Sequence, residues 1–378
     1  MRIAIEARAL TGRGGGTRRY VSELTDQLRR LVPENELVIL DRGPAHELLL
    51  PWWFNVTMPR RLRKTRPDII HWTKGAVSKR KIAPTVVTIY DVIPLLFSES
   101  QKLTGRWYWP RALRGAVRAA DHILTISDAS KRDIVRELGA AEHKITVTPL
   151  AIDPNDFHPT RATDFVGQIR ATGPYILFVG TIEPRKNVPL LIRAFARIAS
   201  DIPHQLIIAG RAYKGEEALR KEIARMNLTD RVRRIGSVPA ADLPALYASA
   251  DLFMWPSIYE GWGFPPQEAM ACGVPVIVSD GGSLPEVVGE AGKVVSFSAP
   301  LRERIHDTDF ERRLAETMLA VLGSETRRVS MREAGLARVK QFSWQRVAEQ
   351  TLGVYQKVLS EGSEKSSSIL RNIEGTTL

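Results

Sequence analysis

Two apolar runs, Leu252–Trp255 and Val274–Val278, flank the segment Pro256-Ser-Ile-Tyr-Glu-Gly-Trp-Gly-Phe-Pro-Pro-Gln-Glu-Ala-Met-Ala-Cys-Gly-Val-Pro275. Short runs rich in β-branched and aromatic residues predict buried strands. Pro265 and Pro266 favour a helix start between them, because the N–H that proline lacks would have no partner within the first helical turn. The segment therefore predicts a strand, a glycine-containing loop, a short helix and a second strand, which is a unit of a parallel α/β sheet.

The same alternation of strand and helix patterns extends from this segment toward both ends of the chain. Helical spacing is clear in Tyr20, Val21, Leu24, Leu28 and Leu31 and again in Pro189–Ile198. Further strands are expected at Arg2–Glu6, Leu37–Leu40, Asp68–Trp72, Thr85–Tyr90, His122–Ile126, Lys144–Thr148, Tyr175–Val179, Gln205–Ala209, Val232–Ile235 and Lys293–Val295. The pattern weakens in Ile152–Gly173, which is rich in Pro, Asp, Thr and Gly and is interpreted as a linker.

These patterns predict an α/β protein with two Rossmann-like, doubly wound domains. We expect the first domain at residues 1–160 and the second at residues 173–342. A helical pattern at residues 343–360 would cross back to the first domain. The Ser-rich residues 361–378 would form a disordered tail.

Composition places the chain among globular proteins. Of its 378 residues, 44% are hydrophobic and 25% are charged, and the single cysteine excludes an intramolecular disulfide. No apolar run reaches the roughly 20 residues that span a bilayer, and the N-terminus lacks a signal-peptide pattern. We therefore expect a cytoplasmic protein, at most peripheral on the inner membrane face. The net charge is +12, and residues 1–160 hold 26 Lys and Arg against 17 Asp and Glu, which favours an anionic partner.

The loop and helix of the central segment carry groups that suit a ligand. Backbone N–H groups between Gly263 and Gln267 would point out of the helix start, which favours a phosphate. Glu260 would lie at the carboxyl edge of the sheet, where open α/β folds bind ligands. Glu268 would lie in the first helical turn, and both carboxylates can accept hydrogen bonds from sugar hydroxyls. Alternatively, Glu268 only complements the helix dipole and Glu260 is a surface charge.

The central segment resembles the E-x7-E element of the retaining family-4 glycosyltransferases. Members of that family have the GT-B fold, in which two Rossmann-like domains face each other across a cleft. Three other segments resemble parts of the family in the right order: Ala120–Asp133, Val179-Gly-Thr-Ile-Glu-Pro-Arg-Lys-Asn187 and Ser279-Asp-Gly-Gly-Ser-Leu-Pro-Glu286. The resemblance covers about residues 1–360 and is specific for the family rather than for a substrate.

The resemblance implies roles for the residues of the second domain. Glu260 would contact the transferred sugar near its reacting face, and Glu268 would hold the nucleotide ribose. Backbone amides around Gly263, Phe264 and Gln267 would line the sugar and the diphosphate, since proline has no amide to offer.

Two cations are expected beside that loop. Arg185 and Lys186 follow a predicted strand, and together they could neutralise the leaving diphosphate without a metal ion. Many family members have an arginine at the position of Thr181. Arg185 therefore either supplies this charge from a shifted position or the site has one cation fewer.

The first domain begins with a glycine-rich loop, Gly12–Thr17, that leads into a helix. Arg18 and Arg19 would lie near the positive end of that helix, which is unfavourable unless an anion binds there. The resemblance implies that the loop, with Gly15 and Gly16, lies near the donor phosphates, and that the two arginines lie on the acceptor side. Exposed arginines without a function are the alternative.

Tyr90 and Asp91 stand where many relatives have His-Asp facing the reacting sugar. A tyrosine, with an ordinary pKa of ~10, is a poor base near neutral pH. This departure favours a mechanism in which the leaving phosphate oxygen takes the acceptor's proton. The alternative for Asp91 is a turn or helix cap.

Aromatic and basic residues are mixed in two stretches of the first domain. Trp52 and Trp53 precede five basic residues between Arg60 and Arg66, and Trp107 and Trp109 precede three arginines. Such mixtures suit an anionic membrane surface. The alternative is that the aromatic residues belong to the core and the arginines to a solvated face.

No metal site is expected. Asp307 and Asp309 form a D-x-D triplet, but it precedes a helical pattern, so we interpret it as a cap. The seven histidines lack ligand spacing, and Cys272 is interpreted as a small core residue.

The sequence therefore predicts a retaining, metal-independent hexosyltransferase without a cofactor. Its substrate would be a nucleotide sugar, GDP-mannose or a UDP-sugar, with mannose favoured. The acceptor would be a glycan or a polyprenyl-diphosphate-linked glycan in cell-surface polysaccharide synthesis. A nucleotide-sugar 2-epimerase of related two-domain fold is an alternative. A basic nucleic-acid-binding protein is a weaker one, because no nucleic-acid-binding signature is present.

Overall fold

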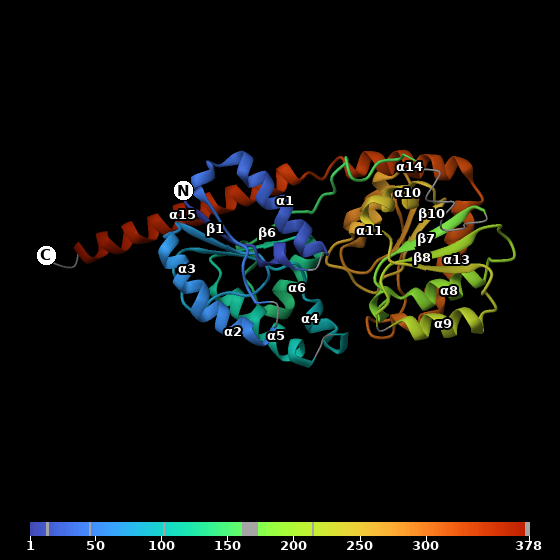
Figure 1. Cartoon of the computed structure of the whole chain (residues 1–378), viewed down its shortest axis with the longest axis horizontal. Helices are drawn as coiled ribbons and strands as arrows, with labels where there is room; N and C mark the ends of the chain where they lie inside the picture. Colours follow the sequence, from blue (N-terminus) through green and yellow to red (C-terminus); the bar gives the residue numbers. More distant parts are fainter. Residues whose placement is uncertain (13–14, 45–46, 101–102, 161–172, 214, 375–378) are drawn as a thin grey trace. The chain divides into compact units, whose positions relative to one another are not determined.

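The computed structural model describes residues 1–12, 15–44, 47–100, 103–160, 173–213 and 215–374 (Figure 1). The chain forms two compact units. The first contains Met1–Leu150 together with Ser343–Leu378, and the second contains Ala151–Phe342. Part of the predicted linker, residues 161–172, lies outside the described residues.

The first unit is built on a parallel six-stranded sheet in the order β2-β1-β3-β4-β5-β6. Its strands are β1 (Ile3–Glu6), β2 (Leu37–Leu40), β3 (Ile69–Trp72), β4 (Thr85–Thr88), β5 (His122–Thr125) and β6 (Ile145–Val147). Its helices are α1 (Gly16–Leu31), α2 (Leu50–Trp52), α3 (Met58–Thr65), α4 (Ile93–Leu96), α5 (Leu103–Ala119), α6 (Asp128–Leu138) and α15 (Trp344–Glu374). A short 3-10 turn, η3 (Glu47–Leu49), and a π-helical turn, η4 (Trp53–Thr57), adjoin α2.

The second unit repeats this plan with the strand order β12-β11-β10-β7-β8-β9. Its strands are β7 (Tyr175–Val179), β8 (Gln205–Ala209), β9 (Val232–Gly236), β10 (Leu252–Trp255), β11 (Val276–Ser279) and β12 (Lys293–Val295). Its helices are α8 (Val188–Ala196), α9 (Glu216–Arg225), α10 (Leu243–Ala248), α11 (Phe264–Ala271), α12 (Leu284–Val288), α13 (Thr308–Leu322) and α14 (Glu325–Val339). The predicted α/β class with two parallel sheets is confirmed, and the ends of the predicted strands differ by at most two residues.

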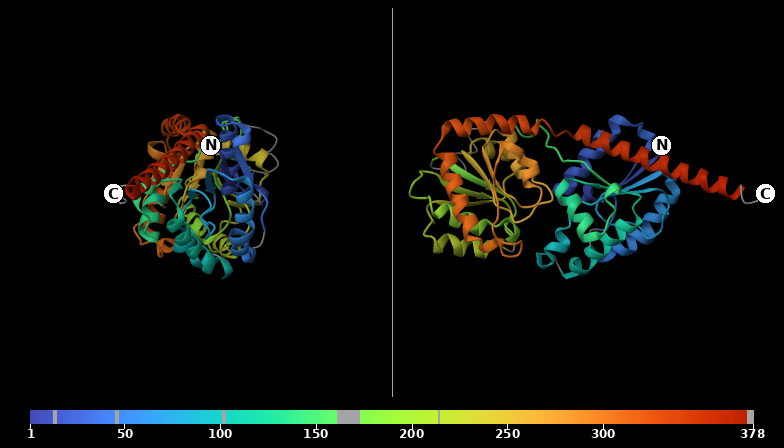
Figure 2. Two further views of the ribbon diagram at one scale, coloured as in Figure 1. Left: turned by 90° about the vertical axis from the view of Figure 1, so that its left-hand side faces the viewer. Right: turned by 180° about the vertical axis from the view of Figure 1, so that it is seen from behind.

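The last helix packs on the first unit although it follows the second in sequence. Both views in Figure 2 show α15 lying along that unit. Tyr355 of α15 is fully buried, and its hydroxyl hydrogen-bonds His71 Nδ1 of β3 (2.6 Å). The tail that the sequence predicts from Glu361 begins within α15, which continues to Glu374. An i,i+4 ion pair between Lys357 and Glu361 (3.9 Å) supports this extension.

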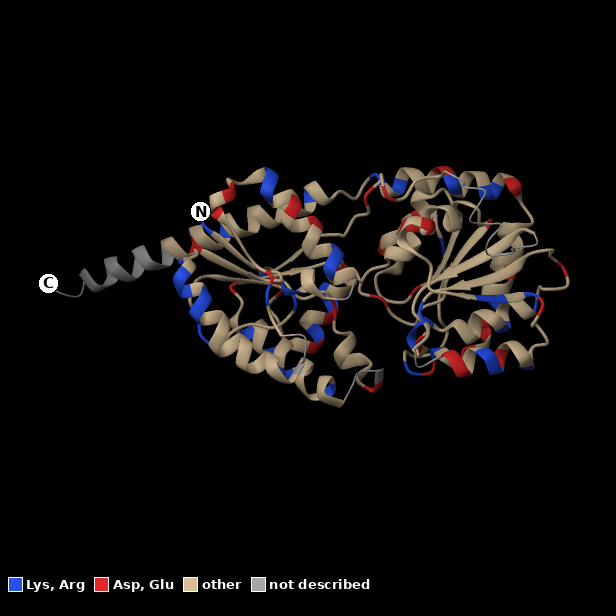
Figure 3. Cartoon of the chain, viewed as in Figure 1, with Lys and Arg blue, Asp and Glu red and all other residues tan. Residues whose placement is uncertain are grey.

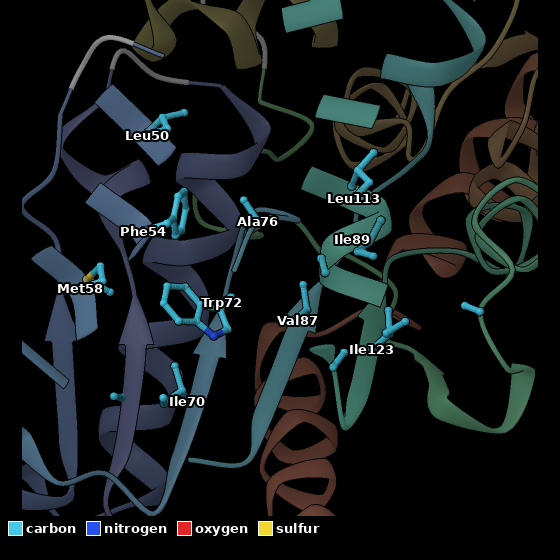
Figure 4. Close-up of a cluster of buried hydrophobic side chains, with 14 of the residues drawn as sticks. Leu50, Phe54, Met58, Ile70, Trp72, Ala76, Val87, Ile89, Leu113 and Ile123 are labelled. Carbon is cyan, nitrogen blue, oxygen red and sulfur yellow. The ribbon is translucent and has the colours of Figure 1, made fainter. Parts of the chain in front are cut away.

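The core of the first unit lies between its sheet and the helices that cover it. Figure 4 shows Phe54 and Met58 on one side of this cluster and Leu113 of α5 on the other. Tyr20, the first residue of the predicted helical pattern in α1, is buried against the other face of the sheet, where its hydroxyl meets Thr88 Oγ1 of β4 (3.1 Å). In the described part of the chain, no helix has both the length and the apolar character to cross a membrane.

Candidate active site

The candidate site of the second unit lies at the carboxyl ends of β7, β10 and β11. The chain runs from β7 outward to β8 on one side, and β10 returns on the other side of β7. The sheet therefore changes direction at β7 and β10, and ligands of open α/β sheets bind at such a point. Each of the three strands contributes a loop, at residues 180–187, 256–263 and 280–283.

Glycines allow these loops to approach one another. Gly282 has a φ of +67°, and a Cβ there would collide with the carbonyl oxygen of Glu260. The Ser283 amide donates to that same oxygen (3.0 Å), and the Ile258 amide donates to the carbonyl of Arg185 (2.8 Å). The loop that carries Glu260 is thus tied to both of its neighbours, which fixes the direction of its side chain.

Glu260 is 7% exposed and lies between two cations. Arg185 Nη1 donates to Glu260 Oε2 (2.7 Å), and Lys186 Nζ donates to Oε1 (2.5 Å). Trp255 Nε1 also donates to Oε1 (3.1 Å), and the Lys186 ammonium lies 4.6 Å from the centroid of the Trp255 ring. Hydrogen bonds and ion pairs on both carboxylate oxygens therefore offset the cost of burying the Glu260 charge.

The electrostatics of the cluster keep Glu260 ionised. Burial alone would raise the pKa of Glu260, but the charges of Arg185 and Lys186 outweigh it and lower the pKa to about 2. Burial and the charge of Arg185 lower the pKa of Lys186, and the carboxylate of Glu260 opposes this. Glu183 adds a second carboxylate, since Arg185 Nη2 donates to its Oε1 (2.6 Å). Two cations thus face two carboxylates.

The first unit has a polar cluster of its own at the corresponding change of strand direction, between β1 and β3. Glu6 ends β1 and is 1% exposed, and its carbonyl accepts from Thr73 Oγ1 (2.6 Å). The Arg8 amide donates to Glu6 Oε1 (3.2 Å). Burial raises the pKa of Glu6, while Arg8 and Lys74 act in the opposite direction. Lys74 Nζ lies 5.5 Å from the centroid of the Trp109 ring.

Comparison with known proteins decides the family. The family model described as Glycosyltransferase Family 4 matches residues 14–156, and that described as Glycosyl transferases group 1 matches residues 160–335. O-antigen chain mannosyltransferase B of Escherichia coli is 33% identical over 331 residues, which cover 84% of this chain and 82% of that protein. The chain belongs to glycosyltransferase family 4.

Solved structures show that this glycosyltransferase has the GT-B fold. Sucrose-phosphate synthase from Thermosynechococcus elongatus aligns with a TM-score of 0.72 at 20% identity, covering 95% of this chain and 99% of the other. HepE of Anabaena, solved with UDP and glucose, aligns with a TM-score of 0.69 at 19% identity, covering 94% and 100%. The α-(1→4)-mannosyltransferase named for MMP in Mycolicibacterium hassiacum is 33% identical over 268 residues, covering 68% of this chain and 59% of that protein.

The structure brings the predicted catalytic residue Glu260 into contact with the predicted donor-binding residues Arg185 and Lys186. Glu268 lies in α11, and its Oε2 accepts from Tyr247 Oη (3.0 Å). Gln267 remains a predicted donor residue; its amide donates to the carbonyl of Gly263 (3.1 Å) as part of the helix.

The start of α11 otherwise follows the predicted pattern. Gly263 is its N-cap and Phe264 its first residue, followed by the two prolines. The side chain of Gln267 is fully buried, and its Oε1 accepts from Trp262 Nε1 (3.2 Å). Gln267 therefore holds the glycine loop in place through Trp262.

In the first unit, Gly15 is the N-cap of α1 with a φ of +100°, and Gly16 begins that helix. Arg18 is exposed and Arg19 half-buried in its first turn, which contains no acidic residue. The two preceding loop residues, 13 and 14, lie outside the described residues.

Tyr90 and Asp91 follow β4. The Tyr90 hydroxyl is buried, and in the described part of the chain it has no hydrogen-bond partner; its ring packs edge-on against Tyr20 at 5.3 Å. Burial raises the pKa of Tyr90 well above 10, which is consistent with its weakness as a base. Asp91 Oδ1 accepts a hydrogen bond from the amide of Ile93 at the start of α4 (2.9 Å). This is the bond that the alternative interpretation of Asp91 as a turn or helix cap requires.

The four tryptophans differ in exposure. Trp52 is 59% exposed and Trp107 is 64% exposed. Trp53 is buried against Phe54, which matches the alternative that these aromatic residues belong to the core. Trp109 is half-buried and packs on the core. The helical geometry determines which tryptophan is exposed, since neighbouring residues of a helix point in different directions.

Two further assignments concern residues outside the site. Asp307 caps α13 by accepting from the Phe310 amide (2.9 Å), as predicted. Cys272 is 2% exposed, and burial raises the pKa of its thiol to about 12, as expected of a core residue.

Sequence reasoning missed the partners of the predicted residues. Glu183 was visible as a carboxylate two residues before Arg185, a signal for a local ion pair. Glu6 and Lys74 were visible as charged residues beside the ends of buried strands. Tyr247, which holds Glu268, gave no signal, because it lies on a different helix.

Proposed function

We propose that this glycosyltransferase moves a hexose, with mannose favoured, from a nucleotide-diphosphate sugar to an acceptor with retention of anomeric configuration. The acceptor is a glycan or a polyprenyl-diphosphate-linked glycan in cell-surface polysaccharide synthesis, so the protein works peripherally at a membrane. The observation that carries the proposal is the contact of Arg185 and Lys186 with Glu260 at the carboxyl edge of the second sheet.

This cluster suits a departing diphosphate. The Lys186 ammonium has three donors, of which one meets Glu260, and Arg185 is positioned by two carboxylates and the Tyr259 carbonyl. Fixed cations that do not reorganise during the reaction stabilise the charge that develops on a leaving group. The acceptor's proton would pass to the leaving phosphate oxygen, so no side-chain base is required.

The names of the relatives support the choice of sugar. Two relatives are named as O-antigen or serotype mannosyltransferases of Escherichia coli, and HepE was solved with UDP and glucose. We therefore propose GDP-mannose as the first donor to test and UDP-glucose as the second.

The test is product analysis with a panel of GDP- and UDP-sugars, with and without a lipid-linked glycan acceptor. We expect an acceptor-dependent glycoside whose anomeric proton shows retention, and activity that survives EDTA. Conversion of the donor to its epimer without any acceptor would overturn the proposal, as would loss of activity in the chelator. Glu260→Ala should abolish transfer, whereas the exposed control Glu333→Ala should not.

A further inference from the structure

A groove crosses the first unit. Its volume is about 760 Å³, which is the size of a ligand pocket. Pro51, Phe54 and Asn55 form one wall, residues 76–79 form the floor, and α5 forms the other wall. Figure 4 shows Ala76 of the floor between Phe54 and Leu113.

Exposed apolar side chains lie on α2 and α5, which contribute to the walls of this groove, and on η3, which packs on both helices. Leu48 and Leu49 in η3, Trp52 in α2, and Leu103 and Trp107 in α5 are each more than half exposed. They are five of the ten large apolar side chains exposed in the described chain, and η3 packs on α5. Single exposed apolar residues are ordinary, but a cluster of this kind marks an interaction surface. We call these five residues the apolar lip.

Three basic residues, Lys79, Arg111 and Arg118, line the groove together with apolar residues, and Arg114 lies on α5 outside this lining. Arg111, Arg114 and Arg118 follow Trp107 on α5 at spacings of four, three and four, so they share one face of the helix, and all three are exposed. Lys79 faces them from the floor. Among the described residues that line the groove, none is a carboxylate. Figure 3 shows Lys and Arg recurring along α3 and α5.

The position of the groove separates it from the reacting groups. Arg118 and Ala119 lie where α5 ends, and the following Asp121 amide donates to Thr85 at the amino end of β4 (2.9 Å). Tyr90 and Asp91 follow the opposite, carboxyl end of that strand. The groove thus extends toward the edge of the sheet away from the predicted reacting groups, which argues for docking rather than for a sugar subsite.

We propose that this surface binds an anionic phospholipid of a bilayer. One hydrocarbon chain enters the groove, its phosphate meets Arg111, Arg118 and Lys79, and the apolar lip enters the membrane interface. Aromatic side chains prefer that interface, and arginines add attraction to anionic lipid. An acidic protein or a nucleic acid would match the arginines but not the leucines. The inference rests on the proposed function in one respect, because a lipid-linked acceptor explains why the protein would bind a membrane.

Gly115 provides a specific test of the groove. It lies in α5 and lines the groove, and a Cβ there would meet no other atom within 4 Å. Gly115→Trp would fill the groove without removing a cation, whereas Gly115→Ala keeps it open. Wild type and both variants are measured by co-sedimentation with vesicles of phosphatidylglycerol and phosphatidylcholine. We expect binding that requires phosphatidylglycerol, is at least several-fold weaker for Gly115→Trp, and is unchanged for Gly115→Ala.

A second variant set tests the charge. Arg111→Ala, Arg114→Ala and Arg118→Ala combined should weaken vesicle binding about 100-fold, from about 1 kcal/mol for each basic residue near an anionic surface. The control removes the same charge from exposed positions of α9 in the other unit: Arg220→Ala, Lys221→Ala and Arg225→Ala.

Several results would overturn the proposal. These are equal binding to neutral vesicles, equal losses in the two triple variants, and wild-type binding by a folded Gly115→Trp. A requirement for polyprenyl phosphate in place of phosphatidylglycerol would make the occupant a lipid-linked substrate and would also overturn it. Vesicle binding is measured without glycosyl transfer. The membrane-docking proposal and the proposed reaction can therefore be refuted independently of each other.

Discussion

Replacing Glu260 with glutamine should destabilise the second unit, because the change leaves the buried cations Arg185 and Lys186 without their shared carboxylate. Removing one partner of a buried ion pair costs about 3–5 kcal/mol. The pKa gives a similar figure: a fall from 4.5 to about 2, at 1.36 kcal/mol per unit, corresponds to about 3 kcal/mol. We take about 3 kcal/mol, because Glu183 still pairs with Arg185.

The assay is differential scanning calorimetry of the full chain at pH 7. For a unit of 150–250 residues, 1 kcal/mol shifts the Tm by about 2–4 °C, so Glu260→Gln should lower it by about 6–12 °C. Adding Lys186→Met should restore part of the loss, because it removes an uncompensated charge. The matched control, Glu333→Gln, changes an exposed carboxylate and should have little effect.

Acid should reduce the difference in Tm between wild type and Glu260→Gln. The pKa of Glu260 is depressed in the folded protein, so its contribution is complete above the unfolded value of 4.5 and is lost as the pH falls toward 2. The gap in Tm at pH 3 should therefore be smaller than at pH 7. A shift below about 1 °C at pH 7, or a double variant no more stable than Glu260→Gln, would refute this account of the cluster.

Three further predictions concern single residues. Lys186→Met should weaken GDP or UDP binding about 10- to 100-fold in titration calorimetry, since a hydrogen bond to a charged group is worth about 1.5–3 kcal/mol; unchanged affinity would remove Lys186 from the donor site. Gly282→Ala should lower both the Tm and transfer, because a Cβ at that left-handed position meets the Glu260 carbonyl; wild-type values would contradict the tight loop contact. The Cys272 thiol, with its pKa raised to about 12 by burial, should resist iodoacetamide at pH 8 until urea unfolds the chain, and rapid labelling of the native protein would show an open site.

The strands could be predicted from the sequence because each is a short apolar run whose signal is local. Leu252–Trp255 and Tyr175–Val179 are buried on both faces, as expected of parallel strands, and their ends were predicted to the residue. The alternation of strand and helix patterns along the chain then predicted the α/β class of the fold.

The candidate site was only partly predictable. Arg185 and Glu260 could each be singled out from their own segments, but their contact joins residues 75 positions apart. Trp52 and Trp53 are adjacent and chemically identical, so only the three-dimensional packing shows that one is exposed and the other buried. The hydrogen bond of the Gln267 amide could not be assigned from the sequence either, because it depends on Gly263 being the N-cap of α11.

The return of the chain to the first unit has a consequence for synthesis on the ribosome. Tyr20 of α1 packs near Trp344 (6.4 Å between ring centroids), and His71 hydrogen-bonds Tyr355. Tyr20 and His71 are therefore synthesised long before the residues of α15 that they contact. The nascent N-terminal unit must hold an incomplete interior while the whole intervening unit is translated and folds. Chains truncated before Trp344 would lack α15 and would leave the apolar surface along α1 exposed to solvent. Such chains should aggregate and bind chaperones.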